Sequence, residues 1–234
     1  MKAEQLSGGY AIWLEPVQLH FHHGDQVKVK VLWGLGMKSD DLSDCGQWKG
    51  TVVDPAGAQV PAQIVRNENG PGNLLVFNSG PEGIYTVQVE NDAGLFYRAG
   101  DGSWSKAENN RSNERDGLRF KQWARLLVPV GHHVHGKGLP LNRGLEIIPE
   151  EFGDFHPGDF IGLSVLYEGQ PLTGARVRAT YHLYEGSGFP HTFTTNEYGQ
   201  FEFKFDARGH WMFQADSRAG DMEHIATLVI PGVR

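Results

Sequence analysis

The chain has 234 residues, of which 39% are hydrophobic and 21% charged, a composition that excludes a disordered or coiled-coil protein. Its formal net charge of −7 gives no general attraction to phosphate backbones, so we expect no nucleic acid partner. The single cysteine, Cys45, excludes an internal disulfide and a cysteine-based zinc site. No long apolar run occurs, so we expect no membrane insertion. The opening MKAEQLSGGY lacks the apolar segment of a signal peptide, so if the protein is exported we expect its leader to have been removed.

The first half of the chain predicts short strands joined by tight turns. The segments QVKVKVLW (26–33) and YTVQVE (85–90) alternate polar and apolar residues, as half-buried strands do. Turn-forming sequences such as DPAG (54–57) and NENGPG (67–72) separate segments of this kind. The polar stretch at 105–120 predicts a long surface loop.

The second half continues this pattern. Strands are expected at 160–167 and 175–183, then on both sides of a turn at Asn196–Gly199, and finally at 209–218 and 224–231. Three alternate phenylalanines after that turn share one strand face: Phe201, Phe203 and Phe205.

These segments predict an all-β protein with little helix, built from two β-sandwich domains of the immunoglobulin-like or transthyretin-like Greek-key type. The segment GHHVHGKGLPLNRG is rich in glycine, proline and histidine and lacks strand alternation. We therefore predict an N-terminal domain at 1–130, a His/Gly-rich linker at 131–143 and a C-terminal domain at 144–234. Ligand sites tend to form where two domains meet, so the linker is a natural place to look for one.

Longer stretches of the sequence resemble a known family. The segments LEIIPEEFGDFHPGDFIGLSVLYEGQPLTGARVRATY (145–181) and TTNEYGQFEFKFDARGHWMFQADS (194–217) resemble the transthyretin-like, or carboxypeptidase-regulatory-like, domain. Together with HHGDQVKVKVLWG (22–34) and QWARLLVPVG (122–131), they look like the bacterial nickel-uptake-associated family. Its members are periplasmic proteins that accompany nickel or cobalt transporters and often carry a domain-of-unknown-function label. The resemblance implies a periplasmic or cell-surface accessory protein that handles nickel, cobalt or zinc beside a membrane transporter complex.

Two histidine groups are candidate metal sites. In the first, His20 and His22 are expected to point to the same face of an extended segment, next to His23. In the second, His133 and His135 have the same alternate spacing, with His132 adjacent. Neutral imidazole is a good ligand for zinc, nickel and copper.

Each group also has a plainer interpretation. The first group can instead be a polar strand edge that leads into a turn at Gly24, and the second a polar joint between domains. The glycines at 131 and 136 would let the three imidazoles of the second group converge. Five single histidines are expected to be ordinary sandwich residues: His156, His182, His191, His210 and His224. The acidic segment at 39–44 lacks the order of a calcium loop and is expected to be solvated.

The sequence offers no catalytic constellation, so we predict a protein that is not an enzyme. The chain contains two segments like those of intradiol dioxygenases, but His133 and His135 precede these segments, whereas the iron-binding histidines of such an enzyme follow them. A hydroxyisourate hydrolase is not indicated either, because this chain ends in IPGVR and those enzymes end in a different tail. Nucleophile-elbow, phosphate-loop and metalloprotease motifs do not occur. We predict a metal-binding accessory of a nickel or cobalt uptake system. The alternative is a metal-free carbohydrate-binding or adhesion module that uses aromatic faces such as those of Tyr97 and Trp104. The sequence leaves the oligomeric state open.

Overall fold

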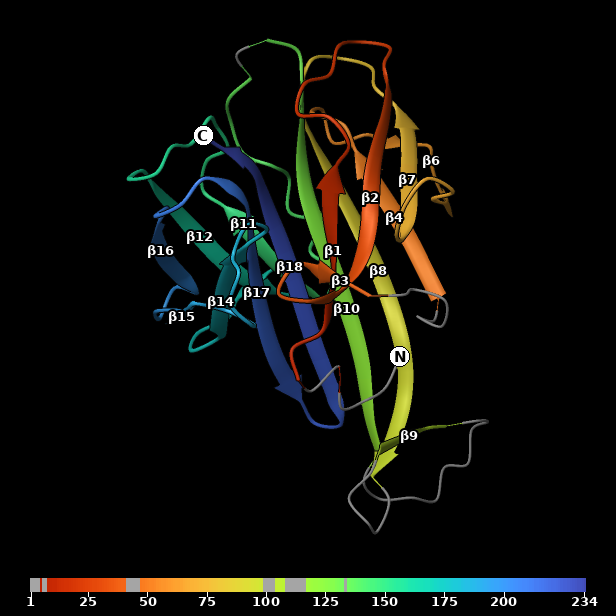
Figure 1. Cartoon of the computed structure of the whole chain (residues 1–234), viewed down its shortest axis with the longest axis vertical. Coiled ribbons are helices and arrows are strands. Elements are labelled where there is room, and N and C mark those ends of the chain that lie inside the picture. The colour runs from red at the N-terminus through yellow and green to blue at the C-terminus, as the bar shows by residue number, and fades with distance from the viewer. Residues whose placement is uncertain (1–4, 6–7, 41–46, 99–103, 108–116, 133) are drawn as a thin grey trace.

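The computed structural model describes the chain except for residues 1–4, 6–7, 41–46, 99–103, 108–116 and 133. Every element in the described part is a β-strand, so the predicted all-β class is confirmed (Figure 1). In the described part of the chain, no helix has the length and apolar character needed to cross a membrane. Cys45 and most of the acidic segment at 39–44 lie outside the described residues.

A nine-stranded sheet forms the centre of the molecule. Its path runs through β15 (His191–Thr194), β14 (Arg176–Tyr181), β17 (Gly209–Ala219), β18 (Met222–Val233), β10 (Gly117–Val130), β8 (Gly83–Arg98), β4 (Gln47–Val53) and β5 (Gln59–Val60). The short strand β9 (Trp104–Lys106) pairs with β8 beside this path.

Two smaller sheets complete the fold. The five-stranded sheet contains β1 (Ala11–Pro16), β2 (Gln26–Leu35), β7 (Asn73–Asn78) and β6 (Ala62–Arg66), with β3 (Lys38–Ser39) paired to β2. The four-stranded sheet contains β11 (Leu145–Pro149), β12 (Phe160–Tyr167) and β13 (Gln170–Pro171), with β16 (Gln200–Lys204) paired to β12.

The smaller sheets cover opposite faces of the central sheet. Paired residues of β10 and β18 share a face, and successive residues of each strand point to opposite faces. Leu126 and its partner Val229 belong to the core beneath the five-stranded sheet. Trp123 and its partner Ala226 belong to the core beneath the four-stranded sheet. The two sandwiches of the predicted fold are therefore present, and they share the central sheet.

This shared sheet crosses the predicted domain boundary. Strand β10 ends at Val130, where the N-terminal domain was predicted to end, and pairs in parallel with β18 from the predicted C-terminal domain. Backbone hydrogen bonds thus join the segments 1–130 and 144–234. Their division into separate domains stays a prediction.

Most predicted strands of the second half are confirmed. The predicted strand at 160–167 is β12, and Phe203 and Phe205 are buried while Glu202 and Lys204 are exposed. The turn at Asn196–Gly199 also forms, but the strands it joins enter different sheets, because β15 pairs with β14 and β16 with β12.

The predicted surface loop at 105–120 is wrong at both ends. Strand β9 extends to Lys106, and β10 begins at Gly117, since β8 and β10 continue their pairing past the body of the sheet (Figure 1). The sequence signal for these strand ends is the alternation of apolar and polar residues, which the high overall polarity of the segment concealed. For example, Leu118 and Phe120 are buried and Arg119 between them is exposed.

The predicted linker at 131–143 is fixed to the central sheet by a buried ion pair. Arg125 of β10 contacts Glu146 of β11, and both side chains are almost completely buried. The Glu146 carboxylate also accepts hydrogen bonds from the backbone N–H groups of Leu141 and Asn142, at 3.0 and 2.9 Å. Arg125 donates to the carbonyl of Leu139 at 3.2 Å. Burial lowers the pKa of Arg125, and the Glu146 charge opposes that shift.

We predict that Glu146→Gln lowers the free energy of unfolding by about 3–5 kcal/mol, because it leaves the Arg125 charge buried without its counter-ion. Urea unfolding monitored by tryptophan fluorescence measures the change. The matched control is Asp92→Asn, which breaks the partly exposed pair between Asp92 and Arg119 and should cost less than about 1 kcal/mol. Equal losses in the two variants would contradict this account of the buried pair.

Candidate metal centre

The loop between β1 and β2 carries the first histidine group and is anchored by Phe21. Phe21 is buried in the core of the first sandwich and forms a parallel bridge with Val130 at the end of β10. In an extended segment the neighbours of an inward side chain point outward. His20 and His22 therefore lie together on the surface, with their ring centroids 4.6 Å apart, as the alternate spacing predicted.

Hydrogen bonds from the turn after His22 fix this part of the loop. The Asp25 carboxylate accepts the backbone N–H of His22 at 2.7 Å, and the Ser79 hydroxyl donates to the His22 carbonyl at 2.6 Å. Ser79 is buried and directly follows β7. The backbone of His22 is therefore held by both the turn and the neighbouring strand.

A glycine turn brings His132 to the same place. Gly131 donates its N–H to the Phe21 carbonyl at 2.8 Å and has a φ of 103°, in the left-handed region that favours glycine. A Cβ atom at this position would lie 2.7 Å from the carboxyl carbon of Glu82. The chain thus leaves β10 in a direction that places His132 beside the β1–β2 loop.

The three rings of His20, His22 and His132 form a compact group, which we call the tri-histidine cluster. Each of the three residues offers a ring nitrogen that lies within 4.8 Å of those of the other two, and all three residues are exposed. Ring centroids of His132 are 4.8 Å from His20 and 5.1 Å from His22. Two nitrogens bound to one zinc ion at 2.0–2.1 Å lie about 3.4 Å apart. Small side-chain rotations therefore bring these nitrogens to ligand distance.

The remaining predicted ligands lie outside this cluster. His23 points elsewhere, with its Nδ1 2.6 Å from the Gly80 carbonyl oxygen. His135 is exposed and lies on the wall of the adjacent groove, near Gly153. His133 lies outside the described residues. The structure thus joins members of the two predicted groups, His20 and His22 with His132, into one site.

Two of the single histidines form a structural pair that is not arranged to bind a metal. Nδ1 of His182 accepts the backbone N–H of His210 at 2.8 Å, and Nδ1 of His210 accepts that of Gly232 at 3.0 Å. In each neutral ring the proton is then on Nε2 and the lone pair of Nδ1 is used by a hydrogen bond. Neither of the two nitrogens of such a ring has a lone pair left for a metal. His191 and His156 contact the carboxylates of Asp206 and Asp159.

His224 is buried against aromatic rings. Its ring stacks on Trp123 at 5.4 Å, and its Nε2 lies 3.4 Å from the Tyr167 hydroxyl. Its Nδ1 has no hydrogen-bond partner among the described residues. The interpretation of His224 as a core residue fits these contacts.

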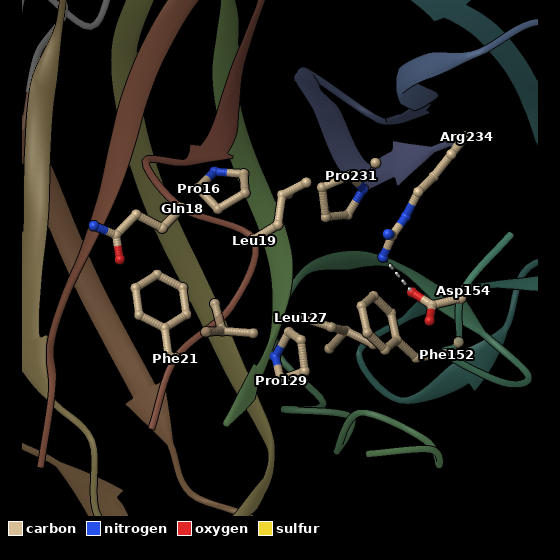
Figure 2. Close-up of a pocket in the computed structure, with 13 residues that line it drawn as sticks. Pro16, Gln18, Leu19, Phe21, Leu127, Pro129, Phe152, Asp154, Pro231 and Arg234 are labelled. Carbon is tan, nitrogen blue, oxygen red and sulfur yellow. Dashed lines mark hydrogen bonds and ion pairs between the residues drawn. The ribbon is translucent and has the colours of Figure 1, made fainter. Parts of the chain in front are cut away.

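A groove opens beside the tri-histidine cluster, between the loops of the two sandwiches. Its outer part has a volume of about 490 Å³ and is lined by His20, His132, His135 and Val134, among others. A smaller inner part, of about 60 Å³, continues between Pro16 and Pro231. Both parts share six residues: Leu19, Pro129, Phe152, Gly153, Asp154 and Arg234. Figure 2 shows the inner part, with Arg234 directed toward Asp154.

Of the aromatic residues near the proposed carbohydrate platform, two are in the core. Phe96 and Trp123 are buried, and Tyr97 is half-buried. The side chain of Trp104 lies outside the described part of the structure. Phe96 and Trp123 therefore offer no exposed ring face for a sugar.

Comparison with known proteins assigns the chain to a family. Residues 8–219 match the family described as "Domain of unknown function (DUF4198)". The chain belongs to this DUF4198 family. The match covers most of both predicted domains, in agreement with the domain-of-unknown-function label of the resembling proteins. The link to nickel uptake and to transthyretin-like domains stays a prediction. No curated protein matches the chain significantly.

Several solved structures are similar to this chain at low identity. The D0–D1 domain of intimin is 11% identical with a TM-score of 0.24, over 94% of this chain and 98% of that one. Murine CEACAM1b is 12% identical with a TM-score of 0.25, over 94% and 98% of the two chains. Salmonella alpha-2-macroglobulin is 14% identical with a TM-score of 0.31, over 95% of this chain but only 15% of its own length. Similarity at this level supports no conclusion about function.

We predict that the buried His224 makes stability depend on pH. Burial lowers its pKa from the ordinary value near 6.5, so the unfolded chain binds this proton more readily than the folded one. The stability contributed by the neutral ring is therefore complete above about pH 6.5 and is lost as the pH falls through that value toward the lower folded pKa. Urea unfolding between pH 7.5 and about 5 tests this.

Replacement of the ring separates His224 from other groups. His224→Phe should make the pH dependence shallower, and the remaining slope includes His210, whose pKa is also lowered by burial. The exposed His156 gives the matched control, since His156→Phe removes an imidazole that is not buried and should change the slope less than His224→Phe does. An unchanged slope in His224→Phe would refute the assignment.

Proposed function

We propose that this protein binds a divalent transition metal at the tri-histidine cluster and releases it to a partner. The observation that supports the proposal is the convergence of His20, His22 and His132, from loops far apart in the chain, within 4.8 Å of one another. An imidazole-only ligand set suits zinc, nickel, copper and cobalt, and it is unsuited to calcium and magnesium, which prefer oxygen ligands.

The openness of the cluster favours transfer over storage. Structural zinc sites are closed by four protein ligands, whereas the cluster offers three exposed ones. The loop backbones are held by Phe21, Ser79 and Gly131, while the histidine side chains are exposed. A metal held in this way can leave without local unfolding of the chain.

Within this role, we propose an extracytoplasmic accessory protein of a nickel or cobalt uptake system, located in the periplasm or at the cell surface. The supporting observation is the resemblance of the sequence to proteins that accompany such transporters, over segments in both sandwiches. The partner would be a membrane transporter complex that takes the ion from the cluster. We also propose that the chain is not an enzyme, because its sequence lacks the catalytic motifs considered above.

We predict that chelator-treated protein binds one Ni(II), Co(II) or Zn(II) ion per chain in isothermal titration calorimetry. Any one of the variants His20→Ala, His22→Ala and His132→Ala should weaken binding at least about tenfold, because each removes one of three ligands. His23→Ala is the matched control, since His23 belongs to the same loop but contacts Gly80. Binding that survives in all three variants, or its absence from the parent protein, would overturn the proposal.

We further predict that the affinity for the metal falls steeply below about pH 6, because protons and metal ions compete for imidazole nitrogens. Titrations at pH 7.5 and pH 5.5 measure the change, with circular dichroism at both pH values to confirm that the chain stays folded. A carboxylate site would keep most of its affinity over this range, so a flat profile would contradict histidine ligands.

A further inference from the structure

We propose that the groove beside the tri-histidine cluster binds an organic carboxylate chelator, so that the cargo is a metal–chelator complex and not the bare ion. This inference rests on the proposed metal-binding function and adds the chemical class of the second ligand. The complex would be held at two points, with its metal on the cluster and its free carboxylate on Arg234.

The open coordination positions and the positive charge of a metal bound at the cluster both favour an anionic second ligand. Three imidazoles leave at least one position open on the metal, and more on an ion of higher coordination number. Histidine binds metals as the neutral imidazole, so the double positive charge of the ion is not compensated by the cluster. An anionic chelator on the open side supplies both the missing donors and the missing charge.

The groove begins at the cluster, so a ligand bound to the metal can extend into it. His20 and His132, two of the three cluster residues, also line the outer groove. A volume of about 490 Å³ is enough for a small organic molecule. Leu19, Pro129 and Phe152 provide apolar walls in both parts of the groove, against which a hydrocarbon backbone can pack.

Arg234 supplies a cation for the free carboxylate. Its backbone N–H donates to the Phe155 carbonyl at 3.1 Å, and its guanidinium lies 3.3 Å from the Asp154 carboxylate (Figure 2). Both side chains of this ion pair are more than two-thirds exposed, at 70% and 77%. Such a pair contributes little stability, so the guanidinium is available to a carboxylate ligand, which it can bind through two parallel hydrogen bonds.

The test uses citrate as the probe, because a tricarboxylate can chelate the metal and still present a free carboxylate. Equilibrium dialysis of the full chain with labelled citrate is carried out with and without one equivalent of Ni(II). We expect citrate to be retained with the protein only when Ni(II) is present. Acetate, which does not chelate, and EDTA, which fills the positions that the histidines need, should not be retained.

Three variants locate the chelator. Arg234→Gln should reduce Ni(II)-dependent citrate retention about tenfold, as expected for the loss of a charged hydrogen-bond donor, and leave the binding of Ni(II) alone unchanged. Asp154→Asn should increase retention, because it removes a competing carboxylate, and general damage to the fold would not produce an increase. Arg66→Gln is the matched control on β6, outside the groove, and should change neither measurement.

The outcomes separate the two proposals. If Ni(II) alone does not bind, the proposed metal-binding function fails. If Ni(II) alone binds but citrate merely strips it from the protein, or if Arg234→Gln and Asp154→Asn retain as much citrate as the parent, the groove proposal fails and the metal-binding function stands. Retention that depends on Ni(II) and changes in opposite directions in these two variants supports the groove proposal.

Discussion

The buried ion pair between Arg125 and Glu146 is the side-chain interaction that fixes the segment between the two sandwiches to the central sheet they share. It joins a strand of the central sheet to the first strand of the four-stranded sheet, and the same carboxylate holds the backbone at Leu141 and Asn142. With it, the histidines that precede this anchor and the groove they line have a defined position relative to both sandwiches.

The tri-histidine cluster likewise depends on a small number of contacts between distant segments. The buried ring of Phe21 and the turn at Gly131 are joined by one backbone hydrogen bond, and this bond sets the distance between the two histidine-bearing loops. Backbone contacts therefore fix the two loops, and the three candidate ligands are exposed side chains on them. This combination supports the proposal that the cluster binds an ion and releases it to a partner.

Part of this site could be predicted from the sequence. Alternation around Phe21 was enough to place His20 and His22 on one face, because it is a local property of an extended chain. The partnership with His132 was not predictable, since it depends on a bridge between Phe21 and Val130. The full set of residues that line the groove was not predictable either, because its walls come from segments of both sandwiches. The arginine within the apolar run QWARLLVPV was the one local sign of a buried ion pair, and the sequence did not reveal its partner.

The sequence by itself determined the class of the fold, most of its strands and the residue type that forms the site, because strand periodicity, turn chemistry and ligand chemistry are encoded within a few neighbouring residues. Tertiary structure alone decided that the two sandwiches share one sheet through the parallel pairing of β10 with β18. It also decided which histidines meet. Pairings of this kind are decided by contacts between distant segments. The free energies of these contacts depend on the packing of the whole chain and not on any local pattern.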